Sequence, residues 1–467
     1  MKRTFDVISP VDGRVVTTIE EASPSQIARC IDAACGAKAA WAATPIADRA
    51  SMMRAFVDAM LGRQDEIAES ITLQMGRPIR YAAGEVQGLA QRARYMADVA
   101  PEALADVVPS PLDGFERRIE RVPLGVVFVL SPWNYPYLTA VNAVVPALLA
   151  GNTVILKHSD QTPLAAEHFK AAMDEAGVPA GVFQILHMSH EATAMVIEDA
   201  QVDHVCFTGS VEGGKAVANA VHRRVAAGSF IGLGLELGGK DPAYVRADAD
   251  LSAAVPNLVE GAFFNSGQSC CGIERIYVHE AVTEAFIEAY AAETYELVLG
   301  NPMSQDTTLG PIVRQRNADV IRAQVTAALE AGARPLIDAG RFPMDRADTP
   351  YMAPQVLTGV SHAMEIMREE TFGPVVGIQV VSGDAQAVEA MNDSQYGLTA
   401  SIWTVDTDAA RAIGAQIATG TVFMNRCDYL DPALAWTGVK QSGRGATLSS
   451  LGFESLTRPK SFHFRLP

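Results

Sequence analysis

The sequence predicts an α/β protein with a doubly wound parallel sheet in one lobe and a second α/β lobe. Short apolar runs without helical period alternate with segments of helical period between residues 122 and 207. The alternation restarts after residue 240. A chain of 467 residues also exceeds the length over which one hydrophobic core keeps growing, so two lobes are expected.

The N-terminal part is expected to be mainly helical. Apolar residues recur at helical spacing over residues 25–41, and Pro45 separates this run from the next, 47–60. Buried strands then alternate with helices, because the apolar runs lose the helical period. The expected strands are residues 122–130, 152–157, 181–186 and 202–207.

A small-residue turn follows the strand 202–207 and indicates a phosphate site. The strand runs into Thr208-Gly209-Ser210, and Gly213-Gly214 opens the next helix. Backbone amides at such a helix start can bind a phosphate. The dinucleotide fingerprint Gly-x-Gly-x-x-Gly does not occur in this turn, so the turn alone is a weak signal.

Composition excludes several classes of partner. The formal charge of -17 comes without a basic stripe, which argues against nucleic acid. No apolar run approaches bilayer length, and the N-terminus does not resemble a secretion signal. Six cysteines are too sparse for a disulfide framework and match no zinc spacing. We therefore expect a cytoplasmic protein with no metal and no membrane contact.

Four short segments stand out: Pro132-Trp133-Asn134-Tyr135-Pro136, Leu235-Glu236-Leu237-Gly238-Gly239-Lys240, Phe264-Asn265-Ser266-Gly267-Gln268-Ser269-Cys270 and Glu369-Glu370-Thr371-Phe372-Gly373-Pro374. Together they resemble the aldehyde dehydrogenase superfamily, in the family's order and at close to its usual separations. The resemblance covers nearly the whole chain. It implies a hydrolytic, NAD(P)-dependent enzyme that oxidises an aldehyde to a carboxylic acid.

The resemblance also implies a subunit of three parts that forms a homodimer or homotetramer. The segment 115–122 and the C-terminal strand would form the arm between subunits; alternating side chains suit a strand at 461–466 and only permit one at 115–122. The expected parts are a cofactor-binding domain (1–106 and 124–237), a catalytic domain (238–436), a small β oligomerisation arm (107–123 and 459–467) and a segment returning to the cofactor domain (437–458).

Aldehyde oxidation requires a nucleophile that turns the carbonyl into a tetrahedral adduct able to release hydride. Cys270 matches the family's nucleophile, which forms a thiohemiacetal and then a thioester. A cysteine considered alone is more often a small buried hydrophobic residue. The surrounding motif favours the catalytic role, whereas Cys271 lies off the motif position and is expected to be only a neighbour.

Two further residues complete the chemistry that the resemblance implies. Asn134 would donate to the oxyanion together with the Cys270 backbone amide, although Asn in this segment could also be only a turn residue. Glu236 would be the general base that hydrolyses the thioester. An isolated Glu is usually a surface charge, but Glu236 stands between apolar neighbours.

Two rival functions stay open at this point. The first is transfer of the acyl group to coenzyme A, and Glu236 argues against it because branches with that activity typically lack this glutamate. The second is a non-catalytic protein on the same scaffold, which would be expected to lack the nucleophile or the base.

The resemblance assigns a cofactor site for NAD, with NADP possible. Asp160 stands where the family usually has Glu; near the adenine ribose its carboxylate would repel a 2′-phosphate, which favours NAD. Lys157 ends an apolar strand, where such sheets bind ligands, although Lys157 and Glu370 could be solvated and Phe372 could be core. The cofactor residues are Trp133, Lys157, Asp160, Gly209, Ser210, Gly214, Glu370 and Phe372.

The substrate pocket and the proton route depart from the usual pattern. Ala143 and Arg458 replace a Lys and a Glu that many members use to pass protons from the base, so Glu236 is expected to use another route. A carboxylated aldehyde would require a cation, for which Arg426 is one candidate. The expected pocket residues are Tyr135, Asn142, Phe264 and Cys427.

Overall fold

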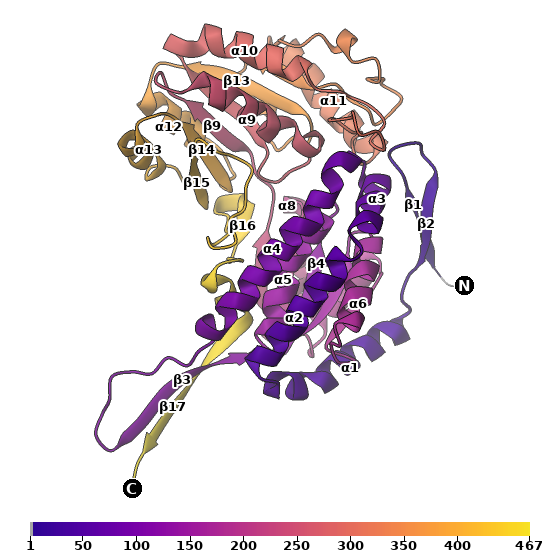
Figure 1. The fold of residues 1–467 in the computed structure, drawn as a ribbon, viewed down its shortest axis with the longest axis vertical. Coiled ribbons are helices and arrows are strands. Elements are labelled where there is room, and N and C mark those ends of the chain that lie inside the picture. Colours follow the sequence, from indigo (N-terminus) through magenta and orange to yellow (C-terminus); the bar gives the residue numbers. More distant parts are fainter. Residues whose placement is uncertain (1–2) are drawn as a thin grey trace.

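The structure, a computed structural model, describes residues 3–467 and contains two α/β lobes, an arm and an N-terminal hairpin (Figure 1). The arm pairs β3 (Phe115–Pro123) with β17 (Thr457–Arg465) and projects from the lower lobe in this view. The hairpin pairs β1 (Thr4–Ile8) with β2 (Val15–Glu20). The predicted α/β fold class is confirmed.

The sheet of the first lobe has six strands, and all but the edge strand β16 run parallel. The chain goes from β4 to β5 on one side and reaches β7 on the other, so the strand order reverses beside β4. Doubly wound sheets bind ligands at the carboxyl ends of the strands at this point. In spatial order the strands are β16 (Gly443–Arg444), β8 (Gly232–Glu236), β7 (His204–Thr208), β4 (Val126–Ser131), β5 (Thr153–His158) and β6 (Phe183–Ile185).

Alternate side chains of β4 enter two separate cores, which is why this sheet is covered on both faces. Val127 and Val129 pack with the group α2 to α6, whereas Val126, Phe128 and Leu130 pack with α1, α7 and α8. The helices are α1 (Pro24–Ala43), α2 (Ile46–Leu61), α3 (Gln64–Met75), α4 (Ile79–Ala103), α5 (Pro136–Leu149), α6 (Leu164–Glu175), α7 (His190–Glu198) and α8 (Val211–Ala226).

Local sequence explains where α1 begins. The Ser23 hydroxyl oxygen accepts from the Gln26 amide at 3.4 Å, and the Gln26 side-chain oxygen accepts from the Ser23 amide at 2.8 Å. This reciprocal capping satisfies two amides that have no partner inside the helix. The helices predicted for 25–41 and 47–60 are confirmed as α1 and α2.

The single strand predicted for residues 122–130 is wrong. The arm strand β3 ends at Pro123, and β4 begins only at Val126. Gly125 between them has a φ of 134° and donates its amide to Asn152 Oδ1 at 2.9 Å. The chain thus turns from the arm into the lobe inside a continuous apolar run, where hydropathy marks no boundary.

The second lobe has a seven-stranded sheet that is parallel except for β11. Ile276 and Val278 face one core and Tyr277 faces another. In spatial order the strands are β11 (Arg334–Pro335), β12 (Gln355–Thr358), β13 (Val375–Val381), β10 (Ile273–His279), β9 (Asp241–Val245), β14 (Thr399–Trp403) and β15 (Thr421–Met424). The helices are α9 (Leu251–Phe263), α10 (Thr283–Tyr295), α11 (Gln315–Glu330), α12 (Asp384–Asn392) and α13 (Thr407–Gly414).

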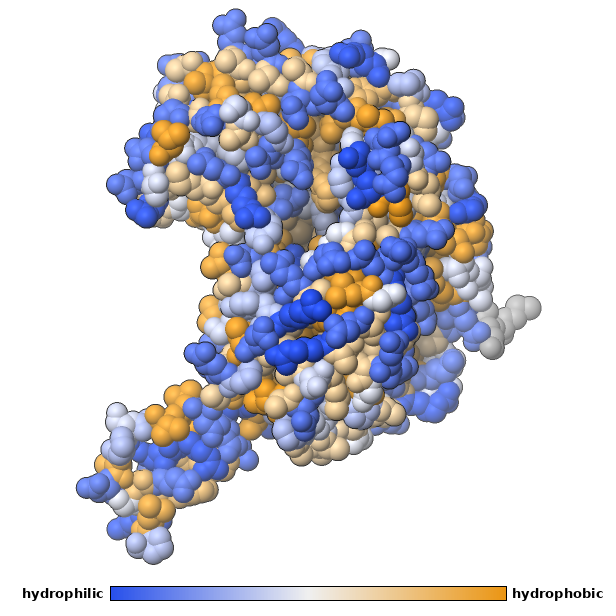
Figure 2. Space-filling view, in the orientation of Figure 1, coloured by the Kyte–Doolittle hydropathy of each residue, from blue (hydrophilic) through white to orange (hydrophobic). Residues whose placement is uncertain are grey.

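The arm stands clear of both lobes and carries apolar side chains on its surface (Figure 2). Val108, beside β3, is 72% exposed, and Phe464 in β17 is 48% exposed. Within residues 3–467 the structure contains no helix with the length and hydropathy needed to cross a membrane.

A buried ion pair connects α4 and α5, the two helices that lie beside the lobe junction. Arg77, just before α4, pairs with Glu85 inside α4, and both side chains are almost fully buried. Arg77 also donates to the Asn134 carbonyl oxygen and to Asn265 Oδ1. Glu85 accepts from the Tyr137 amide at 2.7 Å in the first turn of α5.

Replacing Glu85 with Gln should destabilise the protein by about 3–5 kcal/mol, because Arg77 would stay buried without its counter-charge. The double variant Arg77→Met/Glu85→Leu should lose less free energy of unfolding, because it leaves no charge buried without a partner. Asp58→Asn, which breaks an exposed pair with Arg94, is the control and should cost less than about 1 kcal/mol. Urea denaturation measures all three, and equal losses for Glu85→Gln and Asp58→Asn would contradict the structural importance of the buried pair.

Candidate active site

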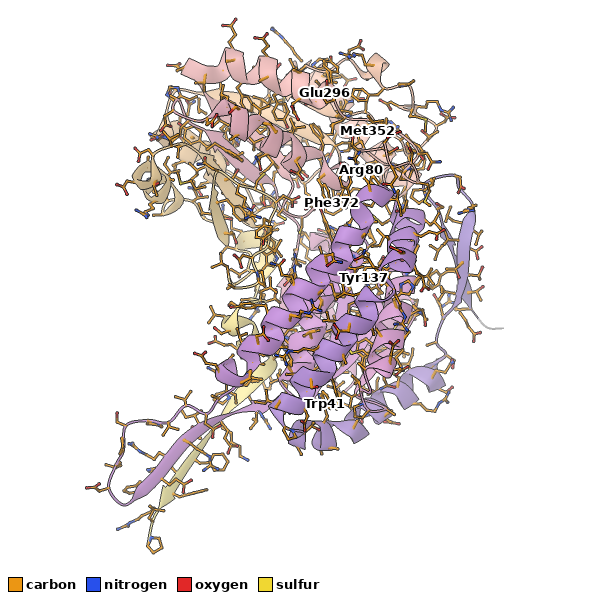
Figure 3. All side chains as sticks on the ribbon, viewed as in Figure 1. Trp41, Arg80, Tyr137, Glu296, Met352 and Phe372 are labelled. Atoms are coloured by element: carbon orange, nitrogen blue, oxygen red, sulfur yellow. The ribbon has the colours of Figure 1, made fainter. Side chains whose placement is uncertain are left out.

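A cavity of about 400 Å³ lies between the lobes. Its walls come from α4, α5 and the end of β8 in the first lobe, and from α9, residues 269–271 and the loop 426–430 in the second. Figure 3 shows Phe372 near the place where the two lobes meet. The predicted site residues that line the cavity are Cys270, Glu236, Tyr135, Asn142, Phe264 and Cys427.

A sharply turned loop carries Cys270. The loop follows the short helix η1 (Phe264–Gly267), in which Asn265 and Ser266 have φ values of 53° and 58°. Gly239 lies against this loop, because a Cβ built there would stand 2.3 Å from the Cys270 carbonyl oxygen. A side chain at position 239 would therefore push the loop out of place.

Asn134 is buried beside the same loop but does not line the cavity. It follows β4, and its side chain is held where its Nδ2 donates to the Gln268 carbonyl oxygen at 3.2 Å. Asn265 Nδ2 donates to that oxygen and also to the Asn134 carbonyl oxygen, each at 3.2 Å. The structure thus places the Asn134 amide next to the chain segment that ends in Cys270.

Glu236 ends β8 and faces the cavity. Thr208 Oγ1 donates to its Oε2 at 3.2 Å, and Thr447 Oγ1 donates to its Oε1 at 2.5 Å. Burial raises the pKa of Glu236, and the two hydroxyls together with Arg92 oppose that rise. A carboxylate with a raised pKa and a place in a cavity is suited to take a proton from water.

Cys271 lines the same cavity as Cys270, but its side chain is held in a hydrogen-bonded cluster with Ser269 and Asp428. Its Sγ donates to Asp428 Oδ1 at 3.0 Å, and the Ser269 hydroxyl donates to the same oxygen at 3.0 Å. The hydrogen bond with the Cys270 thiol, and then burial, raise the pKa of Cys271. A thiol with a raised pKa is a poor nucleophile at neutral pH.

Two aromatic rings meet near the lobe junction (Figure 3), and a buried carboxyl group bonds to Gly239 beside the Cys270 loop. Trp133 and Phe372 meet edge to face with ring centroids 5.5 Å apart. Glu370 Oε1 accepts from the Gly239 amide at 2.9 Å, and burial raises the pKa of Glu370 to about 8. An apolar surface next to a carboxyl acceptor suits a nicotinamide riboside.

The carboxyl end of β5 carries a cation and an acid. Lys157 is almost buried, and burial lowers its pKa. Asp160 lies 3.5 Å from Arg314. Partial burial opposes ionisation of Asp160, but Arg314 and Lys157 outweigh it and its pKa lies below the usual value. Asp160 is therefore an ionised carboxylate between two cations.

The turn after β7 forms the N-terminus of α8. The Ser210 hydroxyl oxygen accepts from the Gly213 amide at 3.1 Å, so Ser210 caps this helix. Gly209 donates its amide to the Glu236 carbonyl oxygen at 3.0 Å. A Cβ on Gly214 would stand 2.7 Å from a Leu237 methyl group, so glycine lets α8 approach β8 closely.

The structure adds site residues that sequence reasoning missed. Thr447 lies 211 positions from Glu236 in the chain, and no local signal marks it. Arg92 has a signal, because it follows Glu85 and Leu89 at helical spacing and so shares their buried face of α4. The missed cavity residues include Arg92, Thr208 and Asp428; Thr447 reaches the cavity through Glu236.

Neither residue at the usual relay positions is placed to exchange protons with Glu236 by side-chain chemistry. Ala143 is buried in α5 and has only a methyl group. Arg458 pairs with Val122 in the arm. The hydroxyls of Thr208 and Thr447 are instead the side-chain groups bonded to the Glu236 carboxylate.

Comparisons with known proteins match almost the whole chain. The aldehyde dehydrogenase family model matches residues 1–462. A succinate semialdehyde dehydrogenase [NAD(P)+] of Escherichia coli (strain K12) is 34% identical over 448 residues, covering 95% of this chain and 94% of the relative.

Solved structures are similar over the whole length. The NAD-dependent aldehyde dehydrogenase from Sinorhizobium meliloti has a TM-score of 0.94 at 33% identity, covering 99% of this chain and 92% of that one. The succinic semialdehyde dehydrogenase from Streptococcus pyogenes in complex with NADP+ has a TM-score of 0.93 at 29% identity, covering 99% and 100%. The chain therefore belongs to the aldehyde dehydrogenase family, and it is an enzyme that oxidises an aldehyde to a carboxylic acid.

Proposed function

We propose that the protein is a hydrolytic NAD(P)-dependent aldehyde dehydrogenase that works through a thioester on Cys270. The observation that carries the proposal is the placement of Cys270 and Glu236 on one cavity, with burial raising the pKa of Glu236. A nucleophile and a base with these properties are the two groups that thioester chemistry requires.

In this mechanism Cys270 attacks the aldehyde carbon as a thiolate, after its proton has gone to water, and forms the oxyanion of a thiohemiacetal. The Asn134 amide and the Cys270 backbone N–H stabilise the oxyanion, and Arg77 fixes the Asn134 backbone. Trp133, Phe372 and Glu370 would hold NAD(P)+ beside Cys270, where it would supply the acceptor for the hydride that leaves the aldehyde carbon. Glu236 then takes a proton from water, the resulting hydroxide attacks the thioester, and the acid leaves as Cys270 is regenerated.

The first lobe and the lobe junction would hold the cofactor. Trp133 and Phe372 offer an apolar surface to the nicotinamide, and Glu370 an acceptor to its ribose. Lys157 and Asp160 stand at the carboxyl end of β5 for the adenine ribose. The α8 N-terminus, with Gly209, Ser210 and Gly214, would receive the pyrophosphate because its amides and dipole favour anions.

The expected domain division, oligomeric state and location complete the proposal. Residues 237–240 connect β8 of one sheet to β9 of the other, which supports a boundary near residue 238. The projecting arm, with Val108 and Phe464 exposed, supports pairing of subunits into a homodimer or homotetramer. Six free cysteines suit a cytoplasmic location.

A narrower candidate concerns the substrate. Relatives of this chain are named as succinate semialdehyde dehydrogenases, whose substrate carries a carboxylate. The buried arginine Arg92 on the cavity wall supports the same class of substrate here.

Cys270→Ser should abolish dehydrogenase turnover, because a hydroxyl of ordinary pKa is a poor nucleophile without its own base. Binding of NAD, followed by fluorescence titration, should change little. Cys271→Ser is the matched control and should keep most of the activity, since a serine hydroxyl can still donate to Asp428. Equal loss of activity in the two variants would reject Cys270 as the nucleophile.

Glu236→Gln should give one burst of NADH and then stall, because attack and hydride transfer precede the step that needs the base. Stopped-flow absorbance measures the burst. Thr447→Val tests the same carboxylate: losing a donor to the ionised form raises the pKa of Glu236, so the acidic limb of the kcat profile should move to higher pH. Undiminished steady-state turnover of Glu236→Gln would rule out the proposed base.

The enzyme should prefer NAD to NADP, and Asp160→Ser should narrow the preference. The Asp160 carboxylate would hydrogen-bond to ribose hydroxyls and repel a 2′-phosphate, and a charged hydrogen bond contributes about 1.5–3 kcal/mol, or roughly tenfold or more. The flanking cations Lys157 and Arg314 weaken the repulsion, so NADP should retain some activity. The ratio of kcat/KM for the two cofactors measures this, and a ratio unchanged by Asp160→Ser would place Asp160 away from the ribose.

A further inference from the structure

Arg92 is a buried cation on the wall of the substrate cavity. Its side chain comes from α4 and is 8% exposed. Nη1 donates to the Leu138 carbonyl oxygen at 2.8 Å and to Asn142 Oδ1 at 3.2 Å. Both acceptors belong to α5, so this helix fixes one side of the guanidinium.

The other side of the guanidinium has no protein partner in the described part of the chain. Nε and Nη2 of Arg92 make no hydrogen bond there, and no ion pair joins Arg92 to a carboxylate. Arg275, by contrast, uses Nε, Nη1 and Nη2 on protein acceptors. Nε and Nη2 form the edge of a guanidinium that binds a carboxylate through two parallel hydrogen bonds.

A buried charge is costly unless it is paired. Burial lowers the pKa of Arg92, but a guanidinium stays protonated in proteins. The fixed charges that act on Arg92, such as Glu236 and Glu85, do so without direct contact. An anion entering the cavity would supply the missing partner.

Resting on the proposed function, we propose that Arg92, oriented by Asn142, binds a carboxylate at the far end of the aldehyde substrate. The enzyme thus selects aldehydes that carry a terminal carboxylate over neutral aldehydes of the same length. Arg426 does not have this role, because its exposed guanidinium stacks on the Tyr429 ring, with Cζ 3.4 Å from the ring centroid.

The test compares kcat/KM for 4-oxobutanoate with kcat/KM for its neutral methyl ester. The parent enzyme should prefer the acid, and Arg92→Met should reduce that preference by about 10- to 100-fold, the size expected for a lost charged hydrogen-bonded pair. The decrease in kcat/KM for the methyl ester should be much smaller. Arg92→Lys should show a preference between those of the parent enzyme and Arg92→Met, since an ammonium keeps the charge but cannot form the two parallel hydrogen bonds.

Two control variants separate this role from others. Arg94→Met changes an exposed arginine on the same helix, paired with Asp58 at 3.0 Å, and should leave the preference unchanged. Arg426→Met should also change it little. Thermal melting checks the fold, and if Arg92→Met does not fold, Arg92→Lys carries the comparison.

Results that would overturn the role of Arg92 differ from the result that would reject the proposed function. Equal losses on acid and ester in Arg92→Met, with a moved pH profile, would mean that Arg92 acts on Glu236 or Cys270, and would overturn the proposal. So would a parent enzyme without preference for the acid, or a preference lost only in Arg426→Met. An enzyme that oxidises neither compound nor any other aldehyde would instead reject the proposed function.

Discussion

The guanidinium of Arg77 contacts three chain segments that lie far apart in the sequence. It pairs with Glu85 in α4, donates to the Asn134 backbone after β4, and donates to Asn265 in the turn that leads to Cys270. It also lies over the Tyr135 ring, 4.4 Å from its centroid. One buried cation that touches neither reacting atom therefore helps to fix the spacing between the proposed oxyanion donor and the proposed nucleophile, together with the direct hydrogen bonds to Gln268.

Burial disfavours the charged forms of Glu236 and Arg92, and this has a different consequence for each group. It raises the pKa of Glu236 and brings that carboxyl group closer to the range where a base is useful. The same burial makes an unpaired guanidinium at Arg92 expensive, so the cavity gains an affinity for anions that no exposed arginine would have. The hydrophobic packing of α4 against α5 thus supports both the chemistry and the selectivity.

Sequence patterns predicted the elements whose signals are local. The helical period located α1 and α2, and apolar runs located β5 and β7. They failed at Gly125, because a turn inside an apolar run has no hydropathy signature. The motif residues could be named from resemblance, but Thr447 could not, since its contact with Glu236 joins positions 211 residues apart. Long-range contacts of this kind depend on the whole topology.

Loops at strand ends and regular helices contribute different groups to the cavity. The groups proposed for chemistry stand on loops at strand ends and in the tight turn before β10, where neighbouring glycines leave little room for change. Another part of the wall consists of side chains on α4 and α5, such as Gln91 and Leu138, held on regular helices. Replacing one of those side chains alters the shape and charge offered to a substrate without moving the strand ends. In evolutionary terms, lineages on this scaffold can exchange one aldehyde for another through substitutions on two helix faces while the reaction itself is inherited intact.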